Sequence, residues 1–149
     1  MKEVLMEDFK QITERSLPWE ELRNKTFLIT GATGLIGSLL TKFLLYANRT
    51  MDLNTKILAV VRNTKKAEKI FEGERTEALS YVVADLAKEG VSFEGTCDYM
   101  IHTAAVTASK VMVSDPVGTI RTAIDGTEKM LQLAVEKKVN AFVYISSME

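Results

Sequence analysis

The sequence predicts an α/β fold in which helices cover both faces of a doubly wound, mostly parallel sheet. Short apolar runs alternate along the chain with segments of helical periodicity. The runs are apolar throughout, as expected for strands that are buried on both faces. Three glycines, Gly31, Gly34 and Gly37, stand where the first run passes into the first long helical segment. These observations predict a sheet of about five strands.

The chain is expected to begin with a helical leader, residues 1–24, that precedes the sheet. Residues 3–15 predict an amphipathic helix that ends near Pro18. Its apolar stripe contains Val4, Leu5, Phe9 and Ile12. Trp19 and Leu22 are expected to pack this leader onto the body of the domain.

The remaining elements follow in the order that a doubly wound sheet requires. The first half is expected to contain a strand over 26–30, a helix from Leu35 to Leu44, a turn over 48–54, a strand over 56–61 and a helix over 64–71 capped by Asn63 or Thr64. The second half is expected to contain a strand over 79–85, a loop over 87–97, a strand over 98–105, a helix over 115–138 and a strand over 141–147. Right-handed crossovers predict the strand order 3-2-1-4-5, counted along the chain.

Composition and charge describe an ordinary globular chain. The 149 residues are 46% apolar and 26% charged, with a net charge of −1. This balance gives no electrostatic reason to expect nucleic acid or an anionic membrane as a partner. The apolar runs are too short for a transmembrane helix, and the N-terminus does not read as a secretory signal. The single cysteine, Cys97, cannot form an internal disulfide, which favours a reducing cytoplasm.

The spacing of the three glycines predicts a dinucleotide-binding turn. In a doubly wound sheet, the first strand-to-helix turn faces a ligand crevice. One glycine permits unusual backbone angles, a second lets a pyrophosphate approach the main chain, and a third lets the helix pack closely on the strand. The free N–H groups of the first helical turn favour an anion. The spacing G-x-x-G-x-x-G is not that of a P-loop, and a tight turn that binds nothing is the alternative.

The end of the second strand indicates which dinucleotide binds. An acid at that position pairs with the ribose hydroxyls of NAD, whereas a nearby arginine accommodates the phosphate of NADP. The strand is followed by Arg62 and Asn63, and the first acid is Glu68. The cofactor is therefore NADP or NAD, and the residues favour NADP. A solvated basic helix face is the alternative role for these positive charges.

No metal site is predicted. His102 is the only histidine, and the only cysteine, Cys97, offers it no constellation of ligands. We expect His102 to be a histidine held in its strand rather than a catalytic one.

Five motifs occur in an order that is similar to one known family. They are TGATGLIG at 30–37, ADL at 84–86, DYMIHTAA at 98–105, DPVGTIRTAIDGTEKML at 115–131 and VYISSME at 143–149. Residues 25–149 thereby resemble the extended short-chain dehydrogenase/reductase family, which contains NAD-dependent nucleotide-sugar epimerases and dehydratases. The resemblance implies a Rossmann fold, an NAD(P) cofactor and hydride transfer at a hydroxyl or keto group of a nucleotide-sugar substrate. It also makes a homodimer plausible, through the helix that carries Met130 and Leu131.

The resemblance further implies a set of site residues. The cofactor would contact Gly31, Thr33, Gly34, Leu35, Ile36, Gly37, Arg62, Asn63, Asp85, Leu86, Thr103, Ala104, Ala105 and Ser146. Within this set, Asp85 would meet the adenine. Thr107 and Ser109 would face the sugar. Ser147 would be the catalytic serine that hydrogen-bonds the sugar oxygen, with a strand-end serine bonded to the local backbone as the alternative.

Glu149 bears on the type of reaction. Dehydratases of the family typically have Thr-Asp-Glu where this chain has Ser147, Met148 and Glu149. Met148 cannot donate a proton, which argues against 4,6-dehydration. Glu149 could still act as an acid or base in epimerisation or decarboxylation, and a surface carboxylate without a catalytic role is the alternative.

The chain departs from the family pattern in two respects. Ala123 and Lys129 replace the usual asparagines of the long helix. The Tyr-x-x-x-Lys pair is also absent, because the residues four positions after Tyr46, Tyr81, Tyr99 and Tyr144 are Thr50, Asp85, Thr103 and Met148. We therefore expect the cofactor-binding part of a longer enzyme, truncated before the Tyr-x-x-x-Lys segment and the substrate domain, and inactive alone.

Two other functions remain open at this stage. One is an NADPH-dependent reductase of a non-sugar carbonyl on the same fold, which the sequence VVRN at 60–63 would suit. The other is a binding module that senses NADP without turnover. A Tyr-x-x-x-Lys pair in the intact protein would favour an enzyme over a sensor.

Overall fold

The sheet of this protein has five parallel strands. A computed structural model of the chain describes residues 3–74, 76–106 and 108–146. The strands are β1 (Thr26–Thr30), β2 (Lys56–Val61), β3 (Leu79–Val83), β4 (Tyr99–His102) and β5 (Ala141–Tyr144). Their order across the sheet is β3-β2-β1-β4-β5, and every neighbouring pair is parallel, which confirms the predicted order.

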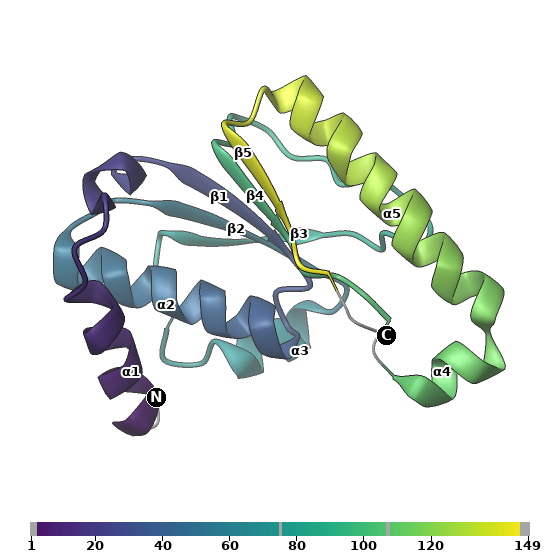
Figure 1. Cartoon of the computed structure of the whole chain (residues 1–149), viewed down its shortest axis with the longest axis horizontal. Helices are drawn as coiled ribbons and strands as arrows, with labels where there is room; N and C mark the ends of the chain where they lie inside the picture. The colour runs from purple at the N-terminus through teal and green to yellow at the C-terminus, as the bar shows by residue number, and fades with distance from the viewer. Residues whose placement is uncertain (1–2, 75, 107, 147–149) are drawn as a thin grey trace.

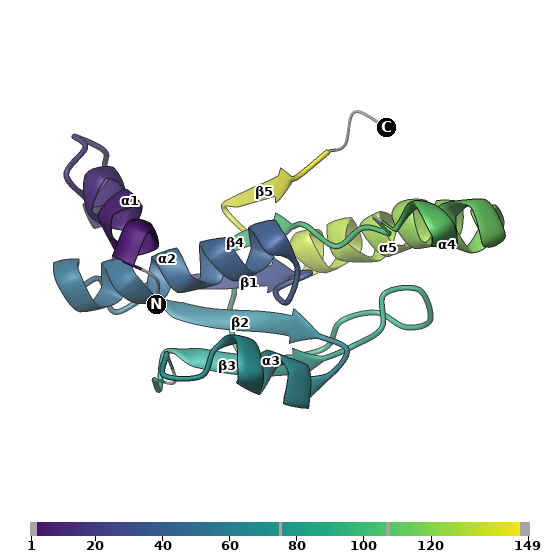
Figure 2. The same ribbon diagram turned by 90° about the horizontal axis from the view of Figure 1, so that it is seen from below.

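Helices cover both faces of this sheet, as predicted. They are α1 (Glu3–Thr13), the 3₁₀ helix η1 (Trp19–Leu22), α2 (Leu35–Met51), α3 (Thr64–Ile70), α4 (Ser109–Ser114) and α5 (Pro116–Lys137). The sheet separates α2 from α5 in Figure 1, and Figure 2 shows the same arrangement from below. Successive residues of a strand point to opposite faces, so each central strand supplies both layers of the core.

Two apolar clusters hold the layers together. On the side of α2 and α3, Ile29 of β1 and Ile57 of β2 pack with Leu45 and Phe71. On the side of α5, Leu28 and Met100 pack with Met130, which is fully buried. Met130 therefore belongs to the core and not to an outward face of α5, whereas Leu131 is exposed. Apolar burial on both faces of the sheet is the main stabilising contribution to this fold.

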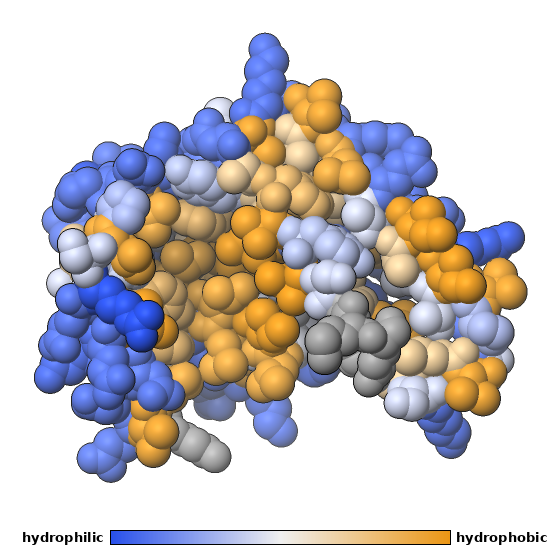
Figure 3. All heavy atoms as spheres, in the orientation of Figure 1, coloured by the Kyte–Doolittle hydropathy of each residue, from blue (hydrophilic) through white to orange (hydrophobic). Residues whose placement is uncertain are grey.

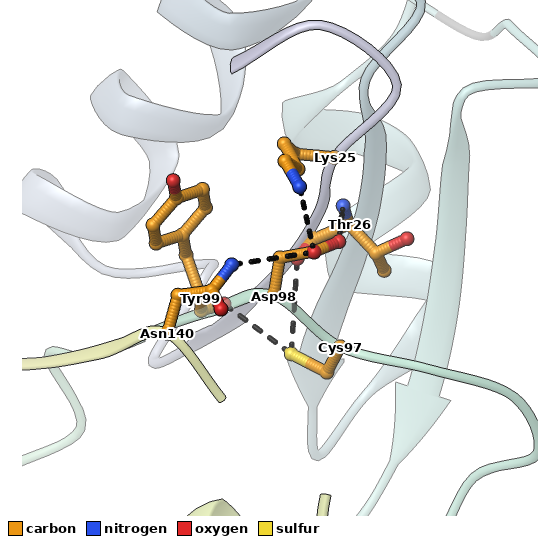
Figure 4. Close-up of polar contacts among 6 residues, drawn as sticks. All are labelled: Lys25, Thr26, Cys97, Asp98, Tyr99 and Asn140. Atoms are coloured by element: carbon orange, nitrogen blue, oxygen red, sulfur yellow. Dashed lines mark hydrogen bonds and ion pairs between the residues drawn. The ribbon is translucent and has the colours of Figure 1, made fainter. Parts of the chain in front are cut away.

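Asp98 ties together the amino ends of three strands (Figure 4). Its carboxylate accepts the N–H of Thr26 at 2.8 Å and lies 3.3 Å from Nζ of Lys25. The side-chain amide of Asn140 donates to the same carboxylate at 3.4 Å, and the backbone N–H of Asn140 donates to the carbonyl of Asp98 at 2.7 Å. Asp98 thus aligns the amino ends of β1, β4 and β5. The carboxyl ends of these strands lie on the opposite side of the sheet, where a site can form.

The leader packs on α2, as expected. The ring of Phe9 lies 5.4 Å from that of Phe43 and 5.7 Å from that of Tyr46. The ring of Trp19 lies 6.1 Å from Phe43, and Leu22 packs against the core on this side of the sheet. Within the predicted stripe of α1, Phe9 is 4% exposed but Val4 is 73% exposed. The prediction was therefore wrong for Val4.

Several boundaries differ from the sequence prediction. Helix α2 continues through residues 48–51, which were expected to form a turn. Asn48 stays helical because its side chain bonds Thr55, donating to the carbonyl at 2.8 Å and accepting from the N–H at 2.9 Å. The strands over 79–85 and 98–105 end earlier, at Val83 and His102, because their partners β2 and β1 end at Val61 and Thr30.

The last two differences concern the C-terminal half of the chain. Strand β5 ends at Tyr144, the residue that pairs with the last residue of β4, and residue 147 lies outside the described residues. The short helix α4 was not predicted, because a helix of this length shows little apolar periodicity. Asp115 caps the following helix α5 by accepting the N–H of Gly118 at 2.9 Å, and Pro116 occupies its first turn, where a missing N–H costs nothing.

Candidate dinucleotide-binding site

The candidate site lies at the carboxyl ends of β1 and β4. These two strands are neighbours at the centre of the sheet. The chain leaves β1 toward α2 on one face and leaves β4 toward α5 on the other. Connections that diverge in this way open a crevice beyond the strand ends, which is where ligands bind in doubly wound folds.

Close contacts explain why two positions of the turn after β1, Gly31 and Gly37, are glycines. Gly31 has a φ of +63°, and a Cβ there would lie 2.7 Å from Oγ1 of Thr103 and 2.9 Å from the N of Ala104. A Cβ at Gly37 would lie 2.4 Å from the carbonyl oxygen of Gly31. All three distances are shorter than real Cβ atoms show, so the chain closes here only without side chains. The structure therefore explains Gly31 and Gly37 by packing.

Gly34 has a different role. A Cβ at this position would meet only the carbonyl of Gly31, at 3.1 Å, so packing alone does not demand a glycine. Its backbone is extended, and its N–H donates to the same carbonyl at 2.8 Å. Gly34 is the residue before α2 and is itself exposed. An exposed glycine that packing does not require is what a close backbone approach by a ligand would explain.

The first turn of α2 begins directly after Gly34. No side chain caps this helix, so the amide groups that follow Gly34 are not satisfied by a capping residue. Leu35 is 80% exposed and Ile36 is 46% exposed, and Thr33 is partly buried beside them. A 17-residue helix with uncapped N–H groups favours an anion at its start.

The exit of β4 forms the floor beside this turn. The N–H groups of Thr103 and Ala104 both donate to Oγ1 of Thr30 at 3.2 Å, and Oγ1 of Thr103 donates to the carbonyl of Thr30 at 2.7 Å. Ala105 follows and is exposed. The segment is thus held against Thr30, the last residue of β1.

His102 is held inside the fold, as predicted. It is 2% exposed, and its Nδ1 lies 2.7 Å from Oγ1 of Thr30. Its Nε2 lies 3.3 Å from Oγ1 of Thr127, on α5. Burial lowers the pKa of His102 below its ordinary value of 6.5. The ring is therefore neutral at physiological pH, and it links the two central strands to α5.

Arg62 and Asn63 follow β2 and are exposed. The side-chain oxygen of Asn63 accepts the N–H of Lys66 at 3.0 Å, so Asn63 is the N-cap of α3, and its NH₂ group is the part that remains for a ligand.

Asp85 and Leu86 lie just beyond β3. The carboxylate of Asp85 accepts the N–H of Ala87 at 3.2 Å and lies 3.6 Å from Nζ of Lys88. The side chain of Leu86 is only 7% exposed and belongs to the core on the α5 side. Only the backbone of Leu86 can therefore face a ligand, whereas the partly exposed Asp85 can offer its carboxylate.

The structure describes only one of the predicted substrate-binding and catalytic residues, Ser109. Ser109, which was expected to face the sugar, is the first residue of α4 and is exposed. Ser146, which was predicted to contact the cofactor, lies two residues beyond β5 and is exposed. The remaining predicted residues, Thr107, Ser147 and Glu149, lie outside the described residues.

Two contributors to the site were not predicted. Thr30 ends β1 and accepts both amides of the β4 exit, and its signals in the sequence are its place at the end of an apolar run and at the start of the motif TGATGLIG. Lys129 reaches across to the carbonyl of Leu86, with Nζ at 3.4 Å. The departure from asparagine at position 129 thus coincides with a contact between α5 and the segment after β3.

Neither a metal-ligand cluster nor a membrane-spanning helix occurs in the part of the chain that the structure describes. Among residues 3–74, 76–106 and 108–146, no group of three or more His, Cys, Asp or Glu side chains could hold a metal ion. Within the same part of the chain, no helix combines the length and apolar character needed to cross a membrane.

The fold and the glycine turn define a dinucleotide-binding domain of the doubly wound class. A sequence profile of the NAD dependent epimerase/dehydratase family matches residues 27–149, and the chain belongs to that family. An uncharacterised membrane protein of Methanocaldococcus jannaschii is 28% identical over 131 residues, which cover 84% of this chain and 37% of that protein. The dTDP-glucose 4,6-dehydratase of Streptomyces antibioticus is 29% identical over 124 residues, which cover 82% of this chain and 37% of that enzyme.

A solved structure shares the fold. The epimerase of Methanothermobacter thermautotrophicus superposes with a TM-score of 0.65 at 21% identity, covering 98% of this chain and 39% of that chain. The chain spans 37% of the length of the two curated relatives described above.

Proposed function

We propose that the chain is the NAD(P)-binding part of an oxidoreductase of the nucleotide-sugar epimerase/dehydratase type. The observation that carries this proposal is the turn from Gly31 to Gly37. Its two outer glycines are required by packing, whereas Gly34 is exposed and meets only one backbone atom. An uncapped helix start directly follows Gly34. These features suit a pyrophosphate that touches the main chain at Gly34.

The residues at the strand ends fit the rest of a dinucleotide. The partly exposed carboxylate of Asp85 would accept the adenine amine, and the backbone of Leu86 would lie beside it. Thr103, Ala104 and Ala105 would line the ribose and nicotinamide, with Ser146 at the end of β5. When bound, the nicotinamide supplies the hydride chemistry, and this chain binds and orients it.

NADP is the preferred cofactor in this proposal. Arg62 is exposed at the end of β2, where the second phosphate of NADP would lie. Asn63 directs its oxygen to the N–H of Lys66, which leaves its NH₂ donors for an anion.

We expect Arg62→Ala to remove the preference for NADP over NAD in calorimetric titrations. Lys69→Ala removes a positive charge at the far end of α3 and is the control. Equal affinities for NAD and NADP before mutation would contradict the role of Arg62.

The chemistry would act on a nucleotide sugar, as the name of the Streptomyces antibioticus relative states for that enzyme. Ser147 would bond the sugar oxygen, Glu149 would serve as acid or base, and Thr107 and Ser109 would face the sugar. The four tyrosines of the sequence supply no Tyr-x-x-x-Lys pair. We therefore expect residues 1–149 to bind the cofactor without turnover, and measurable turnover by the purified chain would contradict this.

Pairing with a second copy through α5 is part of the same proposal. The exposed apolar residues of this helix are Val117 (60%), Ile120 (57%), Ile124 (61%), Leu131 (47%) and Val135 (78%). They recur at helical spacing, and the opposite side of α5 packs on the sheet.

A cytoplasmic location is also proposed, which suits a free and buried Cys97.

Calorimetric titration of NADP and NAD into wild type and Gly34→Val tests the cofactor site. The wild type is expected to bind, and the variant is expected to stay folded but lose binding of both dinucleotides. Gly90→Val is the matched control, because a Cβ at Gly90 meets nothing within 4 Å. Normal binding by a folded Gly34→Val variant would mean that the dinucleotide binds elsewhere on the chain and would contradict the proposed site.

A non-sugar NADPH reductase remains the second candidate, favoured by Arg62 at a position where an NAD enzyme usually carries an acid. Product analysis of the intact protein with UDP-, dTDP- and GDP-sugars separates the two enzymes. Binding of NADP without turnover of any sugar or carbonyl substrate by the intact protein would instead identify a sensor.

A further inference from the structure

The hydrogen bonds around Thr30 determine which atom accepts the proton of its hydroxyl group. A hydroxyl oxygen has one proton to donate and two lone pairs that accept. Oγ1 of Thr30 accepts the N–H groups of Thr103 and Ala104, which occupy both lone pairs. The remaining contact, at 2.7 Å, is to Nδ1 of His102. Thr30 must therefore donate its proton to Nδ1, and Nδ1 must carry no proton of its own.

The contact on the other side of the ring leads to the same tautomer. Oγ1 of Thr127 donates to the carbonyl of Ala123 at 2.6 Å, which uses its only proton. Toward Nε2 of His102, at 3.3 Å, Thr127 can therefore only accept. Nε2 is then the protonated nitrogen. Two independent sets of bonds, on β1 and on α5, thus require the same neutral form of His102.

We propose that His102, as the Nε2-protonated tautomer, is a positioning residue that holds the floor of the dinucleotide site in its binding shape. This inference rests on the proposed cofactor function. Nδ1 of His102 fixes the rotation of the Thr30 hydroxyl, and that hydroxyl in turn accepts the amides of Thr103 and Ala104. His102 acts through Thr30 and does not touch the cofactor.

The packing of Thr103 shows why this position affects binding. Its Oγ1 lies 2.7 Å from the place of a Cβ at Gly31 and 2.9 Å from that of a Cβ at Gly37. Thr103 therefore fills the space that the two glycines leave open. A small shift of the β4 exit moves Thr103 against the turn and changes the path of the amides that would bind the pyrophosphate.

The tautomer is tested directly by nitrogen-15 NMR of the imidazole. The chain has a single histidine, so its spectrum contains one ring. We expect a protonated Nε2 and an unprotonated Nδ1 near pH 7, without any ligand. A ring protonated on Nδ1 would overturn the proposal whatever the cofactor turns out to be.

The positioning role is tested with two amide variants. Asparagine can place an acceptor where Nδ1 lies, whereas glutamine reaches the position of Nε2. We expect His102→Asn to bind NADP within about twofold of wild type and His102→Gln to bind about tenfold more weakly, because only the latter leaves the Thr30 hydroxyl unheld. Melting temperatures of both variants are measured alongside the calorimetric titrations.

The outcomes separate this inference from the proposed function. Equal weakening of NADP binding in both variants would show a merely structural histidine, and equal wild-type affinity would show no role. If the wild type binds neither NADP nor NAD, the proposed function itself fails. Should either variant not fold, Thr30→Ser and Thr30→Val replace the pair, with tighter binding expected for the serine variant, which keeps the hydroxyl. Equal affinities of these two would again overturn the proposal.

Discussion

Thr30 is a polar side chain at the last position of an otherwise apolar strand, and it is fully buried. It accepts two backbone amides, and its hydroxyl lies within hydrogen-bond distance of His102. The burial of His102 could be predicted from its place in an apolar run. Its partners could not, because Thr30 is 72 residues away and Thr127 lies on a different element. Residues of this kind are found only when the register of β1 and β4 is known.

Because His102 is buried, we expect the folded chain to lose stability in mild acid. Its pKa is lowered from 6.5 by burial, so the folded chain holds the ring neutral while the unfolded chain can protonate it. The stabilisation is complete above pH 6.5 and decreases as the pH falls toward the lowered pKa of the folded state. The slope from this group cannot exceed about 1.4 kcal/mol per pH unit.

Thermal unfolding of wild type and His102→Asn between pH 5 and 8 measures this loss. The wild type is expected to lose more stability than the variant below the ordinary pKa of histidine. Parallel pH profiles for the two proteins would show that His102 does not contribute.

Cys97 is expected to be unreactive in the folded protein. The side chain is 3% exposed, and burial raises the pKa of its thiol to about 11 from an ordinary value of 9.0. The thiolate is the reactive form, so the population able to attack a thiol reagent falls about a hundredfold. Reaction with an aromatic disulfide at pH 8 should be slow in the native chain and fast after addition of urea. Fast reaction of the native chain would indicate local opening at the start of β4.

Helix boundaries were predicted well where a local pattern sets them. Helix α5 starts at Pro116, within one residue of the predicted bound, and Asn63, one of the two predicted caps, marks the start of α3. The end of α2 was not predicted, because Asn48 is held by Thr55, which follows the helix. A polar residue predicts a turn only when its side chain has no such partner.

Docking of α1 on α2 predicts a large effect of Phe9→Ala. Phe9 is 4% exposed and contacts two rings of α2, so truncation should lower the free energy of unfolding by about 3 kcal/mol. Val4→Ala, on the same helix but 73% exposed, should change it by less than about 0.5 kcal/mol. Urea unfolding monitored by circular dichroism measures both changes. Similar values for the two variants would mean that the leader does not pack on α2 in solution.

Apolar surface is distributed unevenly over the whole molecule. Figure 3 shows apolar side chains gathered over the middle of one face, with a second group along its right-hand side. At one end of α2 the exposed apolar residues are Leu35, Ile36 and Leu39, and on the edge strand β5 they are Val143 and Tyr144. Together with the outward stripe of α5, these residues make up three groups of exposed apolar side chains, and contiguous apolar surface is where interaction sites are expected.

Pairing of two copies through α5 predicts a shift in mass when its stripe is interrupted. Ile124 is 61% exposed near the middle of the stripe, so Ile124→Lys should convert a dimer to a monomer in sedimentation velocity experiments. Gln132→Lys adds the same charge beside the stripe and should leave the dimer in place. A wild-type chain that sediments as a monomer at high concentration would contradict the proposed pairing.

The strand order, the alternation of layers and the glycine turn were determined by the sequence itself, because each depends on a local pattern of apolar residues or on spacing within a few residues. The tertiary structure alone decided which side chains meet. Asp98 bonds Thr26 across 72 positions of the chain, and His102 lies between Thr30 and Thr127. Tertiary packing also showed that Gly31 and Gly37 are required by close contacts, whereas Gly34 is not. Contacts between distant segments follow from strand register and layer packing, which no single stretch of sequence encodes.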